Sequence, residues 1–218
     1  MTAYVVTGTG TGVGKTFTTC ALLHTARGRG QQVRGLKPVI SGWDAADAQS
    51  DTAQLIRASG STQTVETTSL WRFAAPLSPH RAAAREHQSI DLPALTAWTR
   101  AQIQPGALTL IEGVGGVMAP LSDRTTTLDW MAALGLPVIF VTGSYLGTLS
   151  HTLTALAALH ARGLNVAALV MNETHGSAVT LDEAMQGLAP FITQIPLRIA
   201  QPLVSSWCEA EAIHALEI

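Results

Sequence analysis

Short apolar runs recur along the chain, and most of them are followed by a stretch in which apolar residues recur with helical spacing. The runs expected to form strands are residues 3–7, 33–39, 107–111, 137–142, 166–171 and 194–199. The stretches expected to form helices are residues 15–26, 48–58, 148–160, 181–188 and 206–216. This alternation predicts an α/β fold, with a mostly parallel sheet and helices on both of its faces.

One stretch does not follow the alternation. Residues 59–88 have no regular apolar spacing and contain Pro76 and Pro79, so we interpret them as a long connection that carries function or as surface decoration. The chain has 218 residues, of which 47% are hydrophobic, enough for one sizeable core but cramped for two. We therefore expect one domain covering residues 1–218.

The charge of the chain narrows the class of partner. Its formal net charge is -2, and its 13 basic residues form no cluster, which argues against nucleic acid or an anionic membrane as the main partner. The apolar runs fall short of the roughly 20 residues that cross a bilayer, and the two cysteines lie far apart. We expect a cytoplasmic protein that binds small molecules.

The first predicted strand leads into a glycine-rich turn and then into a helix. Residues 8–16 read Gly-Thr-Gly-Thr-Gly-Val-Gly-Lys-Thr, which resembles a phosphate-binding loop whose first glycine is displaced from position 9 to Gly8. In such a loop Lys15 reaches the outer phosphates and the Thr16 hydroxyl is a ligand of Mg²⁺. The turn predicts a site for a nucleoside triphosphate.

Acidic residues after two predicted strands are candidate metal ligands. Glu112 directly follows the strand at residues 107–111, at the sheet edge where ligands of parallel sheets bind. Asp44, Asp47 and Asp51 come after the second strand, and each of them is equally well a solvated loop residue.

A second lysine is expected at the same edge. Lys37 is near the end of the second predicted strand, and Ser41 follows it closely. Two lysines beside a metal suit the neutralisation of a highly anionic reacting group, which indicates phosphoryl transfer to an anionic small molecule. The alternative for Lys37 is a surface lysine at a strand end.

Taken together in their order along the chain, these features resemble the dethiobiotin synthetase family. The matching pieces are residues 8–16, Lys37-Pro38-Val39 with Ser41-Gly42, Ser50-Asp51, Ser78-Pro79-His80, Glu112-Gly113-Val114-Gly115-Gly116, Leu146-Gly147-Thr148 with His151, and Asn172. The resemblance implies ATP- and Mg²⁺-dependent conversion of 7,8-diaminononanoate and CO2 to a cyclic urea, through an N-carbamate and its mixed anhydride with phosphate.

The resemblance also implies roles for individual residues. The catalytic residues would be Lys37, Lys15 and Thr11, and those contacting the diamino acid would be Ser41, Gly147, Thr148 and Ser150. The nucleotide would be bound by Gly12, Val13, Gly14, Lys15, Thr16, Phe17, Asp51, Glu112, Gly113, Val114, Gly115, Asn172, Glu173, Pro196, Leu197 and Arg198. The metal would be held by Thr16, Asp51 and Glu112, with Asp47 as a rival to Asp51.

Two further expectations rest on this resemblance. Asn172 would recognise adenine, and the chain would form a homodimer in which the helix beginning near Thr148 completes the partner's site. The alternative class is a switch ATPase of chromosome partitioning or septum placement. Those proteins carry a signature lysine where this chain has Gly10, and they usually carry a basic or amphipathic tail.

Overall fold

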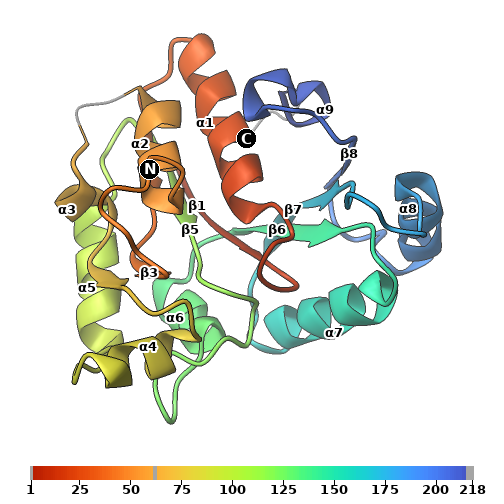
Figure 1. The fold of residues 1–218 in the computed structure, drawn as a ribbon. Helices are drawn as coiled ribbons and strands as arrows, with labels where there is room; N and C mark the ends of the chain where they lie inside the picture. The colour runs from red at the N-terminus through yellow and green to blue at the C-terminus, as the bar shows by residue number, and fades with distance from the viewer. Residues whose placement is uncertain (1, 61–62, 215–218) are drawn as a thin grey trace.

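The computed structural model describes residues 2–60 and 63–214, and its main sheet has six parallel strands (Figure 1). Their spatial order is β2-β5-β1-β6-β7-β8, and every neighbouring pair runs in parallel. The strands are β1 (Thr2–Gly8), β2 (Val33–Leu36), β5 (Leu108–Glu112), β6 (Val138–Gly143), β7 (Val166–Asn172) and β8 (Leu197–Gln201). The predicted α/β fold with a parallel sheet is confirmed.

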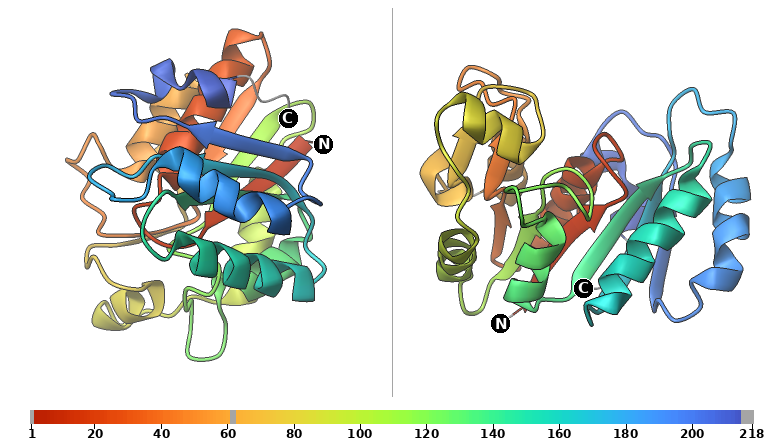
Figure 2. Two further views of the ribbon diagram at one scale, coloured as in Figure 1. Left: turned by 90° about the vertical axis from the view of Figure 1, so that its right-hand side faces the viewer. Right: turned by 90° about the horizontal axis from the view of Figure 1, so that it is seen from below.

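Helices cover both faces of this sheet, as Figures 1 and 2 show. One face packs against α1 (Lys15–Gly28), α2 (Asp51–Ser59) and α9 (Glu211–His214), and the other against α5 (Leu92–Gln102), α6 (Thr127–Leu134), α7 (Thr148–Ala161) and α8 (Leu181–Leu188). Successive strand residues point to opposite faces, so Val5 belongs to one core and Val6 to the other. The near-continuous apolar strands follow from burial on both faces.

The second predicted strand is shorter than expected. Its ladder with β5 ends at Leu36, because Lys37 N donates to Thr68 O at 2.9 Å and Pro38 has no N–H to donate. Beyond this break, β3 (Val39–Ser41) pairs in parallel with β4 (Trp71–Phe73) in a separate two-stranded sheet. The prediction of one strand over residues 33–39 was therefore wrong beyond Leu36.

The connection predicted over residues 59–88 contains regular structure in its described part. It holds α3 (Val65–Thr68), β4 and α4 (Pro79–Arg85), whose proline stands at the first helical position. The preceding helix, α2, begins three residues later than predicted, because Ser50 caps it by accepting a hydrogen bond from Ala53 N. This cap fixes where the first residue of α2 lies.

Two helices, α5 and α6, were not predicted. The Asp91 carboxylate accepts from Ala94 N at the start of α5, and the Asp129 carboxylate accepts from the backbone and hydroxyl of Thr126 at the start of α6. Both caps could have been recognised in the sequence, because an acidic or hydroxyl residue stands at the right spacing before an apolar run.

The C-terminal part also differs from the prediction. Strand β8 covers Leu197–Gln201 instead of residues 194–199, because Ile195 N bonds to Ile192 O in a turn after η1 (Ala189–Phe191). The helix expected at residues 206–216 is a short η2 (Trp207–Glu209) followed by α9, and residues 215–216 lie outside the described ones. Among the described residues, no helix is long and apolar enough to span a membrane.

Candidate active site

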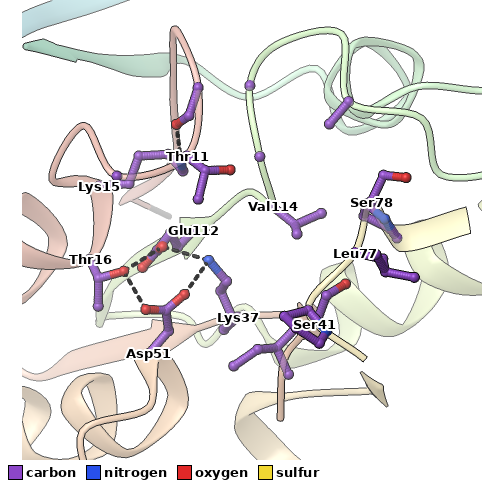
Figure 3. Close-up of a pocket in the computed structure, with 18 of the residues that line it drawn as sticks. Thr11, Lys15, Thr16, Lys37, Ser41, Asp51, Leu77, Ser78, Glu112 and Val114 are labelled. Carbon is purple, nitrogen blue, oxygen red and sulfur yellow. Dashed lines mark hydrogen bonds and ion pairs between the residues drawn. The ribbon is translucent and has the colours of Figure 1, made fainter. Parts of the chain in front are cut away.

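A cavity of about 940 Å³ lies at the carboxyl edge of the parallel sheet, where β1, β2 and β5 end (Figure 3). The loop between β1 and α1 forms one wall, and the segment that follows β4 forms the opposite wall. Lys15, Thr16, Lys37, Asp51 and Glu112 point into the space between these walls. This is the edge at which open parallel sheets bind ligands.

The loop after β1 has the backbone geometry of a phosphate-binding turn. Gly12 and Gly14 have φ values of 78° and 89°, a left-handed conformation that glycine adopts without strain. Because α1 begins at Lys15, its first N–H groups have no partner within the helix and face the loop. Position 8 also requires glycine, because a Cβ there would lie 2.2 Å from Val141 O.

One hydroxyl and two carboxylates meet at the bottom of the cavity. Thr16 Oγ1 lies 2.8 Å from Asp51 Oδ1 and 2.7 Å from Glu112 Oε1. Asp51 reaches this point as the first residue of α2, and Glu112 as the last of β5. Asp47 does not reach it, because it is exposed and its carboxylate accepts from Gln49 N in a local turn.

These three side chains fit a magnesium ion. Mg²⁺ prefers hard oxygen ligands and usually takes one or two carboxylates together with phosphate and water oxygens. Glu112 Oε2 is buried and has no hydrogen-bond partner in the part of the chain described, so one carboxylate oxygen remains available. No group of three or more His, Cys, Asp or Glu side chains suited to a metal occurs within residues 2–60 and 63–214. Phosphate and water would therefore have to complete the coordination.

Lys37 is bound to both carboxylates. Its Nζ lies 2.6 Å from Glu112 Oε1 and 2.8 Å from Asp51 Oδ2, and it donates to Gly113 O at 3.2 Å. Burial alone would lower the pKa of Lys37, but the carboxylates of Glu112 and Asp51 raise it overall. Lys37 is thus a buried, charged ammonium and not a surface lysine.

The two carboxyl groups respond differently to the same surroundings. Burial raises the pKa of Glu112, an effect that the Lys37 ammonium only partly offsets. For Asp51, the opposing effects of Lys37 and Thr16 outweigh burial and lower the pKa. Asp51 is the more readily ionised of the pair.

Lys15 lines the same cavity as Lys37. Its Nζ donates to Gly10 O of the loop at 2.6 Å, and the residue is 6% exposed. Burial, helped by the neighbouring Lys37 ammonium, lowers the pKa of Lys15 to about 8. An anion placed between the two lysines would relieve their mutual repulsion.

The opposite wall of the cavity is largely apolar. It is lined by Ile40, Pro76, Leu77, Pro79, Val114 and Ala119. Ser41 Oγ is buried beside this wall without a hydrogen-bond partner among the described residues, while Thr11 lies exposed at the rim of the loop. A molecule with an aliphatic chain and a polar end matches this combination of surfaces. No role was predicted for Pro76 or Leu77, although the neighbouring Ser78-Pro79-His80 indicated that this segment carries function.

A second cavity of about 400 Å³ lies on the other side of the loop. It is lined by Gly12, Val13, Gly14, Phe17, Asn172, Glu173, Thr174, His175, Gln201, Pro202, Leu203 and Val204. Pro196, Leu197 and Arg198 do not line it, because they lie at the amino end of β8 and the loop faces its carboxyl end. The predicted contact of these three residues with a nucleotide stays a prediction, and the cavity itself is lined at this strand by Gln201 and Pro202.

The predicted residues of α7 line neither cavity within this chain. Gly147 has a φ of 96° at the start of the helix, and Ser150 is exposed. Thr148 is buried instead, donating through its hydroxyl to Gly143 O at 2.6 Å and through its N–H to Tyr145 O at 2.9 Å. A ligand at this helix would meet the next residues of the first turn and not Thr148.

The sheet, the glycine-rich loop and the lysines around it define a P-loop nucleotide-binding protein. The model of a family described as AAA domain matches residues 2–199. The chain is 47% identical over 210 residues to the ATP-dependent dethiobiotin synthetase BioD of Caulobacter sp. (strain K31), covering 95% of this chain and 90% of that protein. It is 45% identical over 199 residues to the synthetase of the same name from Methylobacterium nodulans, covering 87% and 88%. The chain belongs to the ATP-dependent dethiobiotin synthetase family, a family of ligases.

Two solved structures with a similar fold belong to other proteins. The MinC:MinD cell division protein complex of Aquifex aeolicus matches with a TM-score of 0.57 and 10% identity, covering 98% of this chain and 93% of that chain. A ParA family ATPase from Chlorobium tepidum matches with a TM-score of 0.52 and 13% identity, covering 97% and 91%. At these identities the likeness concerns the fold alone.

Proposed function

We propose that this chain uses ATP and Mg²⁺ to convert 7,8-diaminononanoate and CO2 into the cyclic urea dethiobiotin, with ADP and phosphate as the other products. The observation that carries the proposal is the convergence of Lys15, Lys37, Asp51 and Glu112 at one end of a cavity whose other wall is apolar. The charged end suits the phosphates and a carbamate, and the apolar wall suits the carbon chain of the diamino acid. Membership in the family supports the assignment.

The proposed reaction has three steps. One amine of the substrate adds to CO2 and loses a proton, giving an N-carbamate. A carbamate oxygen then attacks the γ-phosphorus while the bond to the β-phosphate oxygen breaks and ADP leaves. The second amine attacks the carbonyl carbon of this anhydride, phosphate leaves with the proton, and the ring closes.

The main barrier in this sequence is repulsion between a carboxylate-like nucleophile and a triphosphate. Lys15 faces the cavity from the start of α1 and Lys37 from the break after β2, so they can flank the region in which the two anions meet. Bound magnesium would neutralise charge on the phosphate oxygens. Thr11 and Ser41 would orient the carbamate through their hydroxyl groups.

We also propose that the site is completed by a second copy of the chain. The resemblance suggests that the carboxylate of the diamino acid binds at the first turn of the partner's α7, near Gly147 and Ser150 on either side of the buried Thr148. Leu146, which is 86% exposed, and Leu149, which is 40% exposed, give this end of α7 an apolar surface that a partner could cover. The N–H groups of the first turn would receive the carboxylate.

Phosphate release from ATP tests the proposed reaction when bicarbonate and 7,8-diaminononanoate are omitted in turn. Release should depend on both, and the cyclic urea should form in equal amount. Release that ignores both omissions would contradict the proposal and favour the switch ATPase that shares this fold.

A further inference from the structure

The side chain of Asn172, the last residue of β7, contacts the phosphate-binding loop directly. Its amide nitrogen Nδ2 lies 2.9 Å from Val13 O, 3.4 Å from Gly14 O and 3.2 Å from Thr18 Oγ1. Carbonyl oxygens only accept hydrogen bonds, so the amide must present its NH₂ group to the loop. This orientation leaves Asn172 Oδ1 buried without a partner in the part of the chain described.

Holding these carbonyls fixes the direction of the amides that matter for phosphate binding. In a planar trans peptide, the C=O of one residue and the N–H of the next point in opposite directions. Asn172 pulls the carbonyls of Val13 and Gly14 toward β7, so the N–H groups of Gly14 and Lys15 are turned to the opposite side. These N–H groups belong to the turn that would receive the phosphates.

The contact with Asn172 also requires glycine at position 14. Gly14 has a φ of 89°, which any other L-residue adopts only with strain. A Cβ at this position would also lie 2.4 Å from Asn172 Nδ2. Gly14 therefore serves both the turn and the close approach of the asparagine.

Asn172 is itself held rigidly. Its backbone pairs with Gly143 of β6 on one side and Gln201 of β8 on the other. Ser144 N donates to Asn172 O at 3.0 Å, which fixes the residue at the end of its strand. Because its backbone is fixed in the sheet, the Asn172 side chain holds the loop at a fixed position relative to the carboxyl edge of the sheet.

We propose that Asn172 is a positioning residue that orients the Gly14 and Lys15 amides toward a bound triphosphate, independently of the base attached to it. The inference rests on the proposed binding of a triphosphate by this loop. It differs from recognition of adenine by the same side chain, because a loop held in place serves every ligand that carries three linked phosphates.

The test compares Mg²⁺-ATP with Mg²⁺-tripolyphosphate, which has no base, by calorimetry or by competition with a fluorescent nucleotide. Asn172→Asp keeps the size of the side chain but replaces the donor by an oxygen that faces Val13 O and Gly14 O. Both ligands should lose affinity by about tenfold or more, by similar factors, since two hydrogen bonds are replaced by repulsion. Asn172→Ala, which adds no charge, should weaken both ligands in the same ratio to a smaller extent.

Asn165→Asp is the matched control, because Asn165 is exposed just before β7, at the opposite end of the strand. It should leave both affinities unchanged. Thermal unfolding without ligand shows whether each variant is folded, and affinities are compared only for the folded protein. Weakened ATP with unchanged tripolyphosphate would overturn the proposal and make Asn172 a base-reading residue, and unchanged affinity for both would also overturn it. If the unmodified protein binds neither ligand, the proposed nucleotide site itself is wrong.

Discussion

Lys37 Nζ lies 2.8 Å from Asp51 Oδ2, and the two groups form an ion pair inside the cavity. Glu112 completes the group at 2.6 Å from the same ammonium. The three residues come from β5, from α2 and from the break after β2, so the arrangement depends on where those elements end. Four predictions follow from this site and its surroundings, each with its own measurement.

Replacement of Lys37 should affect both stability and turnover. Lys37→Gln leaves the buried carboxyl group of Glu112 without its counter-ion, and loss of one partner of a buried ion pair typically costs about 3–5 kcal/mol in the free energy of unfolding, while Asp51 is 36% exposed and adds little. Turnover should fall by about 10²–10³-fold, because the ammonium acts most strongly as charge moves in the transition state. Denaturant unfolding and steady-state kinetics measure the two effects. Near-normal turnover would show that Lys37 has no catalytic role.

Two neighbouring aspartates should respond differently to the same change. Asp51→Asn should raise the Mg²⁺ concentration needed for half-maximal activity, because Asp51 Oδ1 lies 2.8 Å from the Thr16 hydroxyl. Asp47→Asn is the matched control, since that carboxylate is exposed and bonds to Gln49 N. Magnesium titrations of both variants decide the assignment, and a shift for Asp47→Asn alone would reverse it.

The cap of α6 should make part of the stability dependent on pH. Hydrogen bonds from Thr126, first from its backbone, together with the ion pair to Arg162 lower the pKa of Asp129 in the folded protein. A lowered folded pKa means that this stability is present above the unfolded pKa of about 3.9 and is lost as the pH falls through the folded value. Asp129→Asn should therefore cost about 0.5–2 kcal/mol at neutral pH and much less in acid. Urea unfolding at several pH values measures this difference, and a cost that stays constant with pH would contradict it.

A shared active site predicts recovery of activity when two inactive variants are mixed. Ser150 is preferable to Thr148 for this test, because Thr148 is buried and bonded to Gly143 O. Ser150→Asp, at the start of α7, should raise the KM for the diamino acid through charge repulsion and leave the KM for ATP nearly unchanged.

Mixed dimers of Ser150→Asp with Lys37→Gln would then contain one intact site. Activity should return after subunit exchange, while each variant alone stays impaired. A monomer in sedimentation under assay conditions, or no recovery after confirmed exchange, would argue against the shared site.

The sequence was sufficient for the parallel sheet and for the loop after β1. Both depend on local patterns: continuous apolar strands buried on two faces, and glycines at positions with positive φ. The convergence of Thr16 and Glu112 followed from their places at the carboxyl edge of the sheet, as the structure has it.

Other features depend on contacts between residues that are distant in the sequence, so they could not be predicted from local patterns. The strand at Val33 ends early because Lys37 N bonds to Thr68 O, thirty-one residues ahead in a segment with no clear periodicity. The choice between Asp47 and Asp51 was open because it depends on the Ser50 cap, which sets the start of α2. The second cavity could not be predicted around Gln201 and Pro202, because that requires the register of β8, which ends at Gln201 beside the loop.

The ion pairs between Lys37 and the two carboxylates should weaken the binding of magnesium in the absence of nucleotide. A free divalent cation would compete with an ammonium that already contacts both carboxylates, which reduces the electrostatic gain for the metal alone. A nucleotide changes this balance, because its phosphates attract both the metal and the lysine. The metal should consequently enter with the triphosphate, and the protein without nucleotide should be indifferent to the magnesium around it.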